Sequence, residues 1–422
     1  MDKVIFHIDV NSAFLSWSAA YRVRVLGETP DLRDVPSAVA GDKENRHGII
    51  LAKSIPAKKC GVKTGEPIFQ AQKKCPELIL VPPDYELYVQ ASRHLIALLK
   101  EIAPVVEQYS IDEAWVDMSG TEGLYGTPVA AAQMLRQKIL DELGFTVNIG
   151  VSSNKLLAKM AGDFEKPNKV HTLFPWEIEQ KLWPLPVREL YMLGPATEQK
   201  LNRMGIYTIG QLAKAEPQVL QQRLGKAGIS LWHSANGRGS DTLRAQPEEN
   251  KGYGNSTTLA ADVTTAQEAY RVLMSLCETV GMRMRRDKKA ARGLAVSLRD
   301  GEMHTFSHQK LLAAATDGTE ELFRAACLIF DEAWDGKTPL RQLGVAVFRL
   351  EERGARQYSL FDIADARDFE KKAKLDNVID DLREKHGEGI ICRARFTGAQ
   401  TALAGGLSKE RRTGVTKPVG ED

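Results

Sequence analysis

The stretch Tyr109-Ser110-Ile111-Asp112-Glu113-Ala114-Trp115 places two acidic residues between apolar segments. Residues 105–111 and 114–118 are rich in β-branched and aromatic side chains, which predicts two strands joined tightly at Asp112-Glu113. Acidic turns are common in proteins. The hairpin by itself is therefore compatible with a solvated turn or with a metal site.

The segments around this hairpin predict a split ferredoxin-like sheet. Apolar runs and helical periodicity give the order strand, helix, strand, strand, helix, strand. The strands are residues 4–10, 105–111, 114–118 and 147–151, and the helices are about 84–102 and 127–143. An insertion of about residues 13–76 follows the first strand and predicts a subdomain of its own.

Asp9 lies near the end of the first apolar strand, where an unpaired buried carboxylate costs on the order of several kcal/mol. In a ferredoxin-like sheet this strand lies beside the hairpin, so we expect Asp9, Asp112 and Glu113 to converge on one edge. Clustered carboxylates repel one another, and their oxygens suit Mg²⁺ with substrate phosphates completing its shell. Two such ions about 3.5–4 Å apart clamp the attacking and leaving oxygens of a phosphoryl transfer.

Three blocks of the sequence are similar to a known family. They are His7-Ile8-Asp9-Val10-Asn11-Ser12-Ala13-Phe14, Tyr109-Ser110-Ile111-Asp112-Glu113-Ala114 and Gly150-Val151-Ser152-Ser153-Asn154-Lys155-Leu156-Leu157-Ala158-Lys159. They resemble the Y-family translesion DNA polymerases, the family that includes DNA polymerase IV and the catalytic subunit of polymerase V. The resemblance covers about residues 4–350 and favours the metal site over the solvated turn.

The resemblance implies an α+β multidomain fold, the right hand of a polymerase. Its parts are a ferredoxin-like palm at residues 1–12 and 77–168, small fingers at 13–76, a helical thumb with a helix-hairpin-helix at 169–240, an α/β little finger at 245–350 and a tail at 351–422. It also implies an error-prone, poorly processive DNA-directed DNA polymerase that copies past lesions. Its partners would be primer-template DNA and deoxynucleoside triphosphates.

For the acidic residues, the resemblance implies that Asp9 and Asp112 bind two Mg²⁺ ions with help from the Val10 carbonyl. Glu113 would complete the catalytic site beside the primer 3′-hydroxyl. The reaction is an in-line attack of that hydroxyl on the α-phosphate of the incoming nucleotide, with pyrophosphate leaving. Positioning and charge neutralisation suffice for this step, without a covalent intermediate.

Further residues are expected to meet the nucleotide. By resemblance, Phe14 would exclude ribonucleotides through a clash with the 2′-hydroxyl; the alternative is a core aromatic on a helix. Lys159 matches a position that meets the triphosphate, and the alternative is a solvated lysine. The fingers depart from the family pattern, since Ile55 and Lys58 stand where better-known members carry Tyr and Arg. Lys58 offers a point charge instead of a bidentate fork, so a weaker grip on the nucleotide is expected.

One expected DNA contact is a helix-hairpin-helix. Residues 193–206 resemble this motif, in which Gly194 and Gly205 would let backbone amides approach a phosphate at a helix N-terminus. Such contacts position DNA and carry no sequence information. The alternative is an ordinary packing turn.

A second expected DNA contact is the basic segment 281–310. It holds eight basic and three acidic residues, a net charge of +5 against +2 for the whole chain. The family's little finger tracks the duplex backbone, and the expected contacts here are Arg283, Arg285 and Arg286. The alternative is a basic face that is merely solvated.

The tail contains Gln357-Tyr358-Ser359-Leu360-Phe361, which resembles the peptide that docks bacterial polymerases on the sliding clamp. Gln357, Leu360 and Phe361 are its expected anchors. A helix follows whose apolar face would carry Leu375, Val378, Ile379 and Leu382.

The composition limits the remaining possibilities. The five cysteines are odd in number and never form a C-x-x-C pair, which argues against a disulfide framework and a structural zinc site and favours a reducing cytosol. The N-terminus lacks a signal-peptide pattern, and no apolar stretch approaches the ~18–20 residues that span a bilayer. A cytoplasmic monomer that contacts no membrane is therefore expected.

Two alternatives come from other classes. One is a non-catalytic DNA-binding, clamp-associated scaffold, which would have no need for clustered, mutually repelling acids. The other is a nucleotide cyclase with a similar palm, which would leave the helix-hairpin-helix and the basic segment without a purpose. Mg²⁺-dependent primer extension discriminates among them.

Overall fold

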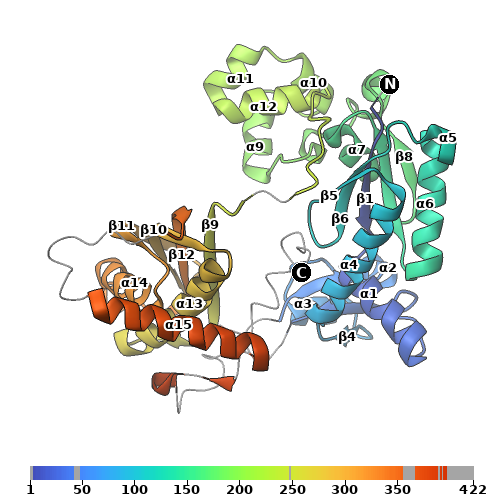
Figure 1. Ribbon diagram of the computed structural model, residues 1–422. Helices are drawn as coiled ribbons and strands as arrows, with labels where there is room; N and C mark the ends of the chain where they lie inside the picture. The colour runs from blue at the N-terminus through green and yellow to red at the C-terminus, as the bar shows by residue number, and fades with distance from the viewer. Residues whose placement is uncertain are drawn as a thin grey trace. The chain divides into compact units, whose positions relative to one another are not determined.

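The structure is a computed structural model, and it describes residues 3–41, 48–246, 249–354, 366–387, 390–391 and 393–396. Contacts within the chain divide it into two compact units, whose helices and strands are drawn in Figure 1. Among the described residues, the first unit comprises 3–41 and 49–246, and the second comprises residue 48 and the residues from 249 onward.

A five-stranded sheet of order β5-β6-β1-β7-β8 forms the centre of the first unit. Its strands are β1 (Ile5–Val10), β5 (Val105–Gln108), β6 (Glu113–Asp117), β7 (Val147–Ser152) and β8 (Val170–Thr172). The first four strands have the predicted ferredoxin arrangement, and β8 adds a parallel edge strand beside β7. β1 is buried along its whole length and pairs with both β6 and β7, which puts Asp9 next to the hairpin.

Helices cover both faces of this sheet. One face carries α4 (Tyr85–Ile102) and α6 (Pro128–Leu143), which share an apolar core with β1, and the short α5 (Glu122–Tyr125) precedes α6. On the other face α7 (Lys155–Gly162) packs against β1 and β7. Gly150 permits this close approach, because a Cβ atom there would lie 1.9 Å from the Ala158 carbonyl oxygen.

The insertion folds around a three-stranded sheet of order β3-β2-β4. Its elements are α1 (Ala13–Tyr21), a π-helical turn (Arg22–Leu26), β2 (Ser37–Ala40), β3 (Ile50–Lys53), α2 (Ile55–Lys59), α3 (Ile68–Lys74) and β4 (Ile79–Val81). β4 pairs parallel with β2, so this subdomain extends beyond the expected boundary at residue 76. The boundary was misplaced because a strand as short as β4 has the same sequence pattern in either sheet.

Short helices with their own apolar core complete the first unit. They are two 3₁₀ turns (Pro175–Glu177 and Val187–Glu189), α8 (Ile178–Lys181), α9 (Pro195–Arg203), α10 (Ile209–Lys214), α11 (Pro217–Leu224) and α12 (Lys226–Ala235). This part corresponds to the predicted helical thumb.

The second unit is built on an antiparallel sheet of order β11-β10-β12-β9, with α13 and α14 on one face (Figure 1). Its elements are β9 (Gly252–Val263), α13 (Ala266–Arg286), β10 (Lys289–Asp300), β11 (Thr305–Thr316), α14 (Thr319–Ala333), β12 (Leu340–Glu352), α15 (Ala366–His386) and a 3₁₀ turn (Ala394–Phe396). The expected strands 293–298 and 343–350 lie within β10 and β12. The tail helix α15 contacts α13.

Candidate active site

The three acidic residues lie near one another where β1 ends beside the β5–β6 hairpin. Glu113 is the cross-strand partner of Asp9, and directly opposed residues of antiparallel strands project from the same face. Asp112 precedes β6, and its carbonyl oxygen accepts a hydrogen bond from the Val10 amide at 3.1 Å. The structure thus brings Asp9, Val10, Asp112 and Glu113 together at one edge.

The charges of these carboxylates act on one another. Burial raises the pKa of Asp9, and the Glu113 carboxylate raises it further. Burial also raises the pKa of Asp112 and Asp9 adds to the shift, whereas a hydrogen bond from the Ser110 hydroxyl at 2.7 Å opposes it. A bound cation would offset both the desolvation and the mutual repulsion of this group.

Two lysine ammonium groups form ion pairs with these carboxylates. Lys159 of α7 is buried, and its Nζ lies 2.6 Å from Oε1 of Glu113. Lys166 bonds to Asp9 and lies 2.9 Å from the Asp163 carboxylate. Burial by itself lowers the pKa of Lys166, but Asp9 and Asp163 raise it overall. The ammonium group expected to meet the triphosphate, that of Lys159, is therefore paired with the Glu113 carboxylate here.

Lys166 is a site residue that no motif of the sequence indicates. It lies in Lys166-Pro167-Asn168, beyond the end of α7, and the Asn168 amide donates to Oδ1 of Asn11 at 2.9 Å. Asn11 in turn donates to Asn148 of β7 at 3.1 Å, so this loop is tied to the residues that follow Asp9. In the sequence, Lys166 is a lysine before a Pro-Asn pair that follows α7. Such lysines are common, so the contact with Asp9 cannot be predicted without the fold.

The donor set fits a hard divalent cation. Asp9, Asp112 and Glu113 offer carboxylate oxygens and Val10 offers a backbone carbonyl, and oxygen donors of these kinds are the ones that Mg²⁺ takes in proteins. The two lysines stand in for cations at the same acids, which indicates that this edge needs positive charge.

Phe14 lies on α1, five residues beyond Asp9. Its ring stacks on Tyr88 with centroids 4.5 Å apart and planes 7° apart, and Tyr85 meets it edge-on at 6.2 Å. Because the side chain is only half-buried, one part of a rigidly packed ring stays open. This placement is compatible with a rigid side chain that contacts the nucleotide sugar. It is equally compatible with an aromatic residue of the core.

The fingers helix α2 presents its two unusual residues to solvent. The Ser54 hydroxyl caps α2 by accepting a hydrogen bond from the Ala57 amide at 3.1 Å. Ile55 is 46% exposed and Lys58 is exposed as well, so both are accessible to a ligand. The nucleotide contact of Lys58 stays a prediction.

Comparison with known proteins gives the family. Residues 8–163 match the impB/mucB/samB family, residues 176–206 the IMS family HHH motif, and residues 250–360 the impB/mucB/samB family C-terminal domain. DNA polymerase IV of Clostridium acetobutylicum is 42% identical over 395 residues, which cover 93% of this chain and 98% of that protein. The chain belongs to the impB/mucB/samB family of Y-family DNA polymerases.

Other comparisons agree with this membership. DNA polymerase IV of Acetivibrio thermocellus is 37% identical over 403 residues, covering 94% of this chain and 99% of that protein. The solved structure of the Y-family DNA polymerase chimera Dbh-Dpo4(243-245)-Dbh is similar with a TM-score of 0.71 and 23% identity, covering 82% of this chain and 98% of that one. The predicted Y-family fold is thereby confirmed.

The two glycines of the predicted helix-hairpin-helix lie at opposite ends of α9. Gly194 is the N-cap of α9, and the N-terminal end of a helix favours a phosphate. Gly205 follows α9 with φ of +77°, and its amide donates to the Asn202 carbonyl while the Ile206 amide donates to Leu201, both at 3.0 Å. These two bonds form a Schellman motif that ends the helix. The Gly205 amide is thus engaged and does not lie at a helix N-terminus, contrary to the expectation, whereas the Gly194 contact stays a prediction.

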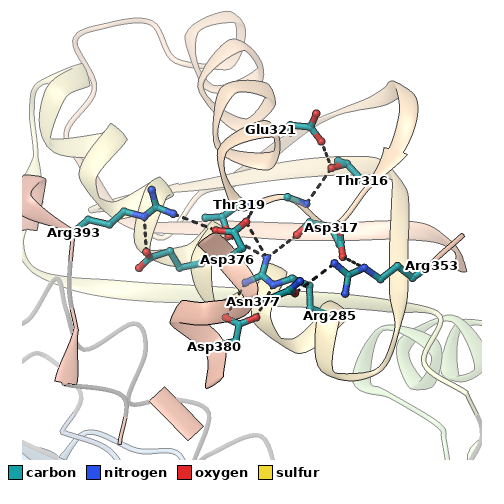
Figure 2. Close-up of polar contacts among 12 residues, drawn as sticks. Arg285, Thr316, Asp317, Thr319, Glu321, Arg353, Asp376, Asn377, Asp380 and Arg393 are labelled. Carbon is teal, nitrogen blue, oxygen red and sulfur yellow. Dashed lines mark hydrogen bonds and ion pairs between the residues drawn. The ribbon is translucent and has the colours of Figure 1, made fainter. Parts of the chain in front are cut away.

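Two of the three arginines expected on DNA are buried in the little finger. Arg283 is 7% exposed and lies over the ring of Tyr253 at 5.4 Å. Arg285 is also 7% exposed and binds Asp380 of α15 and the Asp317 carbonyl, as Figure 2 shows. The prediction that these two contact the duplex backbone is wrong, because their charges are used in contacts within the domain.

Exposed cations remain at the same end of α13. The Arg286 side chain is 62% exposed and pairs with its neighbour Asp287 at 3.5 Å. Lys288 is exposed, and Arg292 of β10 lies 3.9 Å from Glu351 at the surface. Surface pairs of this kind are weak, so these charges are available to an anionic ligand.

The tail helix docks through its charged side. Asp376 and Arg383 of α15 are buried, whereas Leu375 and Val378 of its apolar face are 52% and 53% exposed. The clamp-peptide residues Gln357, Leu360 and Phe361 lie outside the described residues. Among the helices that the structure describes, none has the length and apolar character needed to cross a membrane.

Proposed function

We propose that this protein extends a primer 3′ end by transferring deoxynucleotides through the acids at the end of β1. As a Y-family polymerase of the DNA polymerase IV group, it is a DNA-directed DNA polymerase of translesion synthesis. The observation that carries the assignment of the site is the cross-strand pair of Asp9 and Glu113 beside Asp112. Three neighbouring carboxylates fit a cation-dependent nucleotidyl transfer. A non-catalytic scaffold would have no need for them.

The enzyme is a metal-dependent nucleotidyltransferase, and we infer two Mg²⁺ ions per site. Asp9 and Asp112 would hold both with the Val10 carbonyl, and Glu113 would complete the site. When bound, such ions neutralise charge on the attacking oxygen, the phosphate and the leaving group.

The lysines have a separate part in this proposal. Lys166 bonds to Asp9, and its side chain is 37% exposed, so its ammonium group faces both the acids and solvent. We infer that it pairs with the triphosphate once cations satisfy Asp9. Lys159 is held between Glu113 and the rings of Tyr109 and Tyr191, at 5.8 and 5.2 Å, and we infer that it positions Glu113. Its contact with the triphosphate stays a prediction.

Mg²⁺-dependent extension of a primer on undamaged and lesion-bearing templates tests the function. Incorporation that needs both the divalent cation and a complementary deoxynucleotide supports the polymerase. DNA binding without any incorporation would support the scaffold instead. We further propose that the protein acts in the cytoplasm as a monomer.

Sugar selection gives a test of Phe14. We expect Phe14→Ala to raise ribonucleotide incorporation relative to deoxynucleotide incorporation about 10- to 200-fold, since a steric contact in a pocket is worth ~1–3 kcal/mol. The measurement is the ratio of kcat/KM for the two nucleotides. Phe14→Tyr keeps the ring and is the control, which should retain discrimination. An unchanged ratio in Phe14→Ala would mean that another residue excludes the 2′-hydroxyl.

For the duplex, we propose that the Gly194 turn of the thumb and the exposed cations of the little finger contact the DNA backbone. Those cations are Arg286, Lys288 and Arg292. Each phosphate contact that is lost should flatten the dependence of log K on log salt by about 0.9.

We also propose that the peptide Gln357–Phe361 binds a sliding clamp. A tether to a ring around DNA converts rebinding into an intramolecular event at a raised effective concentration. Replacing Gln357, Leu360 and Phe361 with Ala should leave single-nucleotide addition unchanged and remove clamp stimulation of long extension. Stimulation of the triple variant to the wild-type extent would refute the assignment.

A further inference from the structure

The fingers hold a group of ligand atoms that the polymerase reaction does not use. Cys60 follows the last residue of α2, Cys75 follows the last residue of α3, and Glu77 lies two positions further on. Their two sulfur atoms and one carboxylate oxygen lie within 4.8 Å of one another. In the part of the chain that the structure describes, this is the only such trio of His, Cys or acidic side chains.

We propose that Cys60, Cys75 and Glu77 bind a thiophilic divalent cation such as Zn²⁺. Zinc accepts cysteine sulfur and carboxylate oxygen, and it takes four ligands, so water would fill the remaining position. Each thiol gives up its proton to solvent as its sulfur lone pair binds the ion, and no electron transfer is involved. The Mg²⁺ expected in the palm prefers oxygen, so the two sites select different metals.

The surroundings supply both an anchor and an entrance. Cys75 is buried in the apolar core of the fingers with Ala57 and Ala71, and its amide donates to the Ala71 carbonyl at 2.9 Å. Cys60 and Glu77 are exposed, so an ion can reach the group from solvent. Both cysteines also lie at helix C-termini, where the partial negative charge of the backbone favours a cation.

The two thiols are fifteen positions apart, which is why a search for C-x-x-C spacing does not find them. The fold brings them together just beyond the ends of α2 and α3, where Nζ of Lys74 donates to the Gly61 carbonyl at 3.2 Å. A bound ion would fix the C-terminal end of α2, the helix that presents Lys58 two residues before Cys60. The site would therefore stiffen the nucleotide side of the fingers without touching the palm.

Cobalt titration of the full-length, reduced chain tests this site. Co²⁺ bound to thiolates gives a sulfur-to-metal charge-transfer band that the palm carboxylates do not produce. We expect the band to saturate at one ion per chain and to disappear when Zn²⁺ is added. Cys60→Ser and Cys75→Ser should lose it, and Glu77→Gln, which removes a charged ligand, should weaken metal binding. Cys327→Ser, which changes a cysteine of α14, is the matched control and should keep the band.

A second readout separates metal binding from misfolding. Zn²⁺ should raise the Tm of the wild type and of Cys327→Ser, because a ligand that binds the folded state stabilises it. It should leave the Tm of Cys60→Ser unchanged at the same concentration. Three outcomes would overturn the proposal. The wild type could lack the band, the band could survive in both Cys60→Ser and Cys75→Ser, or Zn²⁺ could raise the Tm equally in all variants. A Cys60–Cys75 disulfide in a chain that takes up no metal after reduction would overturn it as well.

Discussion

The Asp112→Asn variant is expected to extend a primer at least ~10³-fold more slowly than the wild type, a loss of about 4 kcal/mol of transition-state stabilisation. The amide has nearly the shape of the carboxylate and can still accept a hydrogen bond from Ser110, but it lacks the negative charge that we propose holds the metal ions. Single-turnover addition of one nucleotide, with saturating DNA and Mg²⁺, measures the effect.

Asp117→Asn is the matched control for this experiment. Asp117 lies at the other end of β6, opposite Ile5, and its carboxylate lies 2.7 Å from Nζ of Lys3. Its extension rate should stay close to that of the wild type. Asp112→Asn should keep DNA binding and fold stability, because removing one partly buried negative charge relieves its repulsion with Asp9. Wild-type extension by Asp112→Asn would contradict the catalytic assignment.

The palm is the part of the fold that the sequence predicts best. Its strands are short apolar runs separated by helices with clear boundaries, and Asp84 caps α4 as an N-cap residue would, with Oδ1 accepting from the Leu87 amide at 3.1 Å. The sheet order then places Asp9 beside the hairpin that carries Asp112 and Glu113. Local patterns and one topological rule therefore suffice to place the acids side by side, whereas their reading as a metal site depended on the resemblance to the family.

The missed features depend on contacts between distant segments. Lys166 meets Asp9 across 157 positions, and Arg285 meets Asp380 across 95. A pattern of charges shows that a helix end is basic, but it does not show which acids cover it. For the same reason the apolar stripe of α15 predicts a packed face, whereas the structure leaves Leu375 exposed and buries Asp376.

The second large effect is expected in the little finger. Arg285→Ala should lower the free energy of unfolding of this domain by about 3–5 kcal/mol, the usual cost of removing one partner from a buried ion pair. The Arg285 side chain is 5% exposed, binds both carboxylate oxygens of Asp380 at 2.6 and 3.0 Å, and donates to the Asp317 carbonyl at 2.7 Å. Figure 2 shows that Asp376 belongs to the same network, through an ion pair with Arg285. Urea unfolding of the full chain, with a probe in the little finger, measures the loss.

Arg286→Ala is the control, because it removes the neighbouring charge from a side chain that is 62% exposed. Its stability should change by less than about 0.5 kcal/mol. Its DNA binding should become less dependent on salt, with a slope smaller by about 0.9 if one phosphate contact is lost. Arg285→Ala, measured where it remains folded, should keep the wild-type slope. The two variants therefore separate a charge that holds α15 on the domain from a charge that holds DNA. Wild-type stability of Arg285→Ala together with a shallower salt dependence would mean that Arg285 contacts phosphate and that α15 does not cover it.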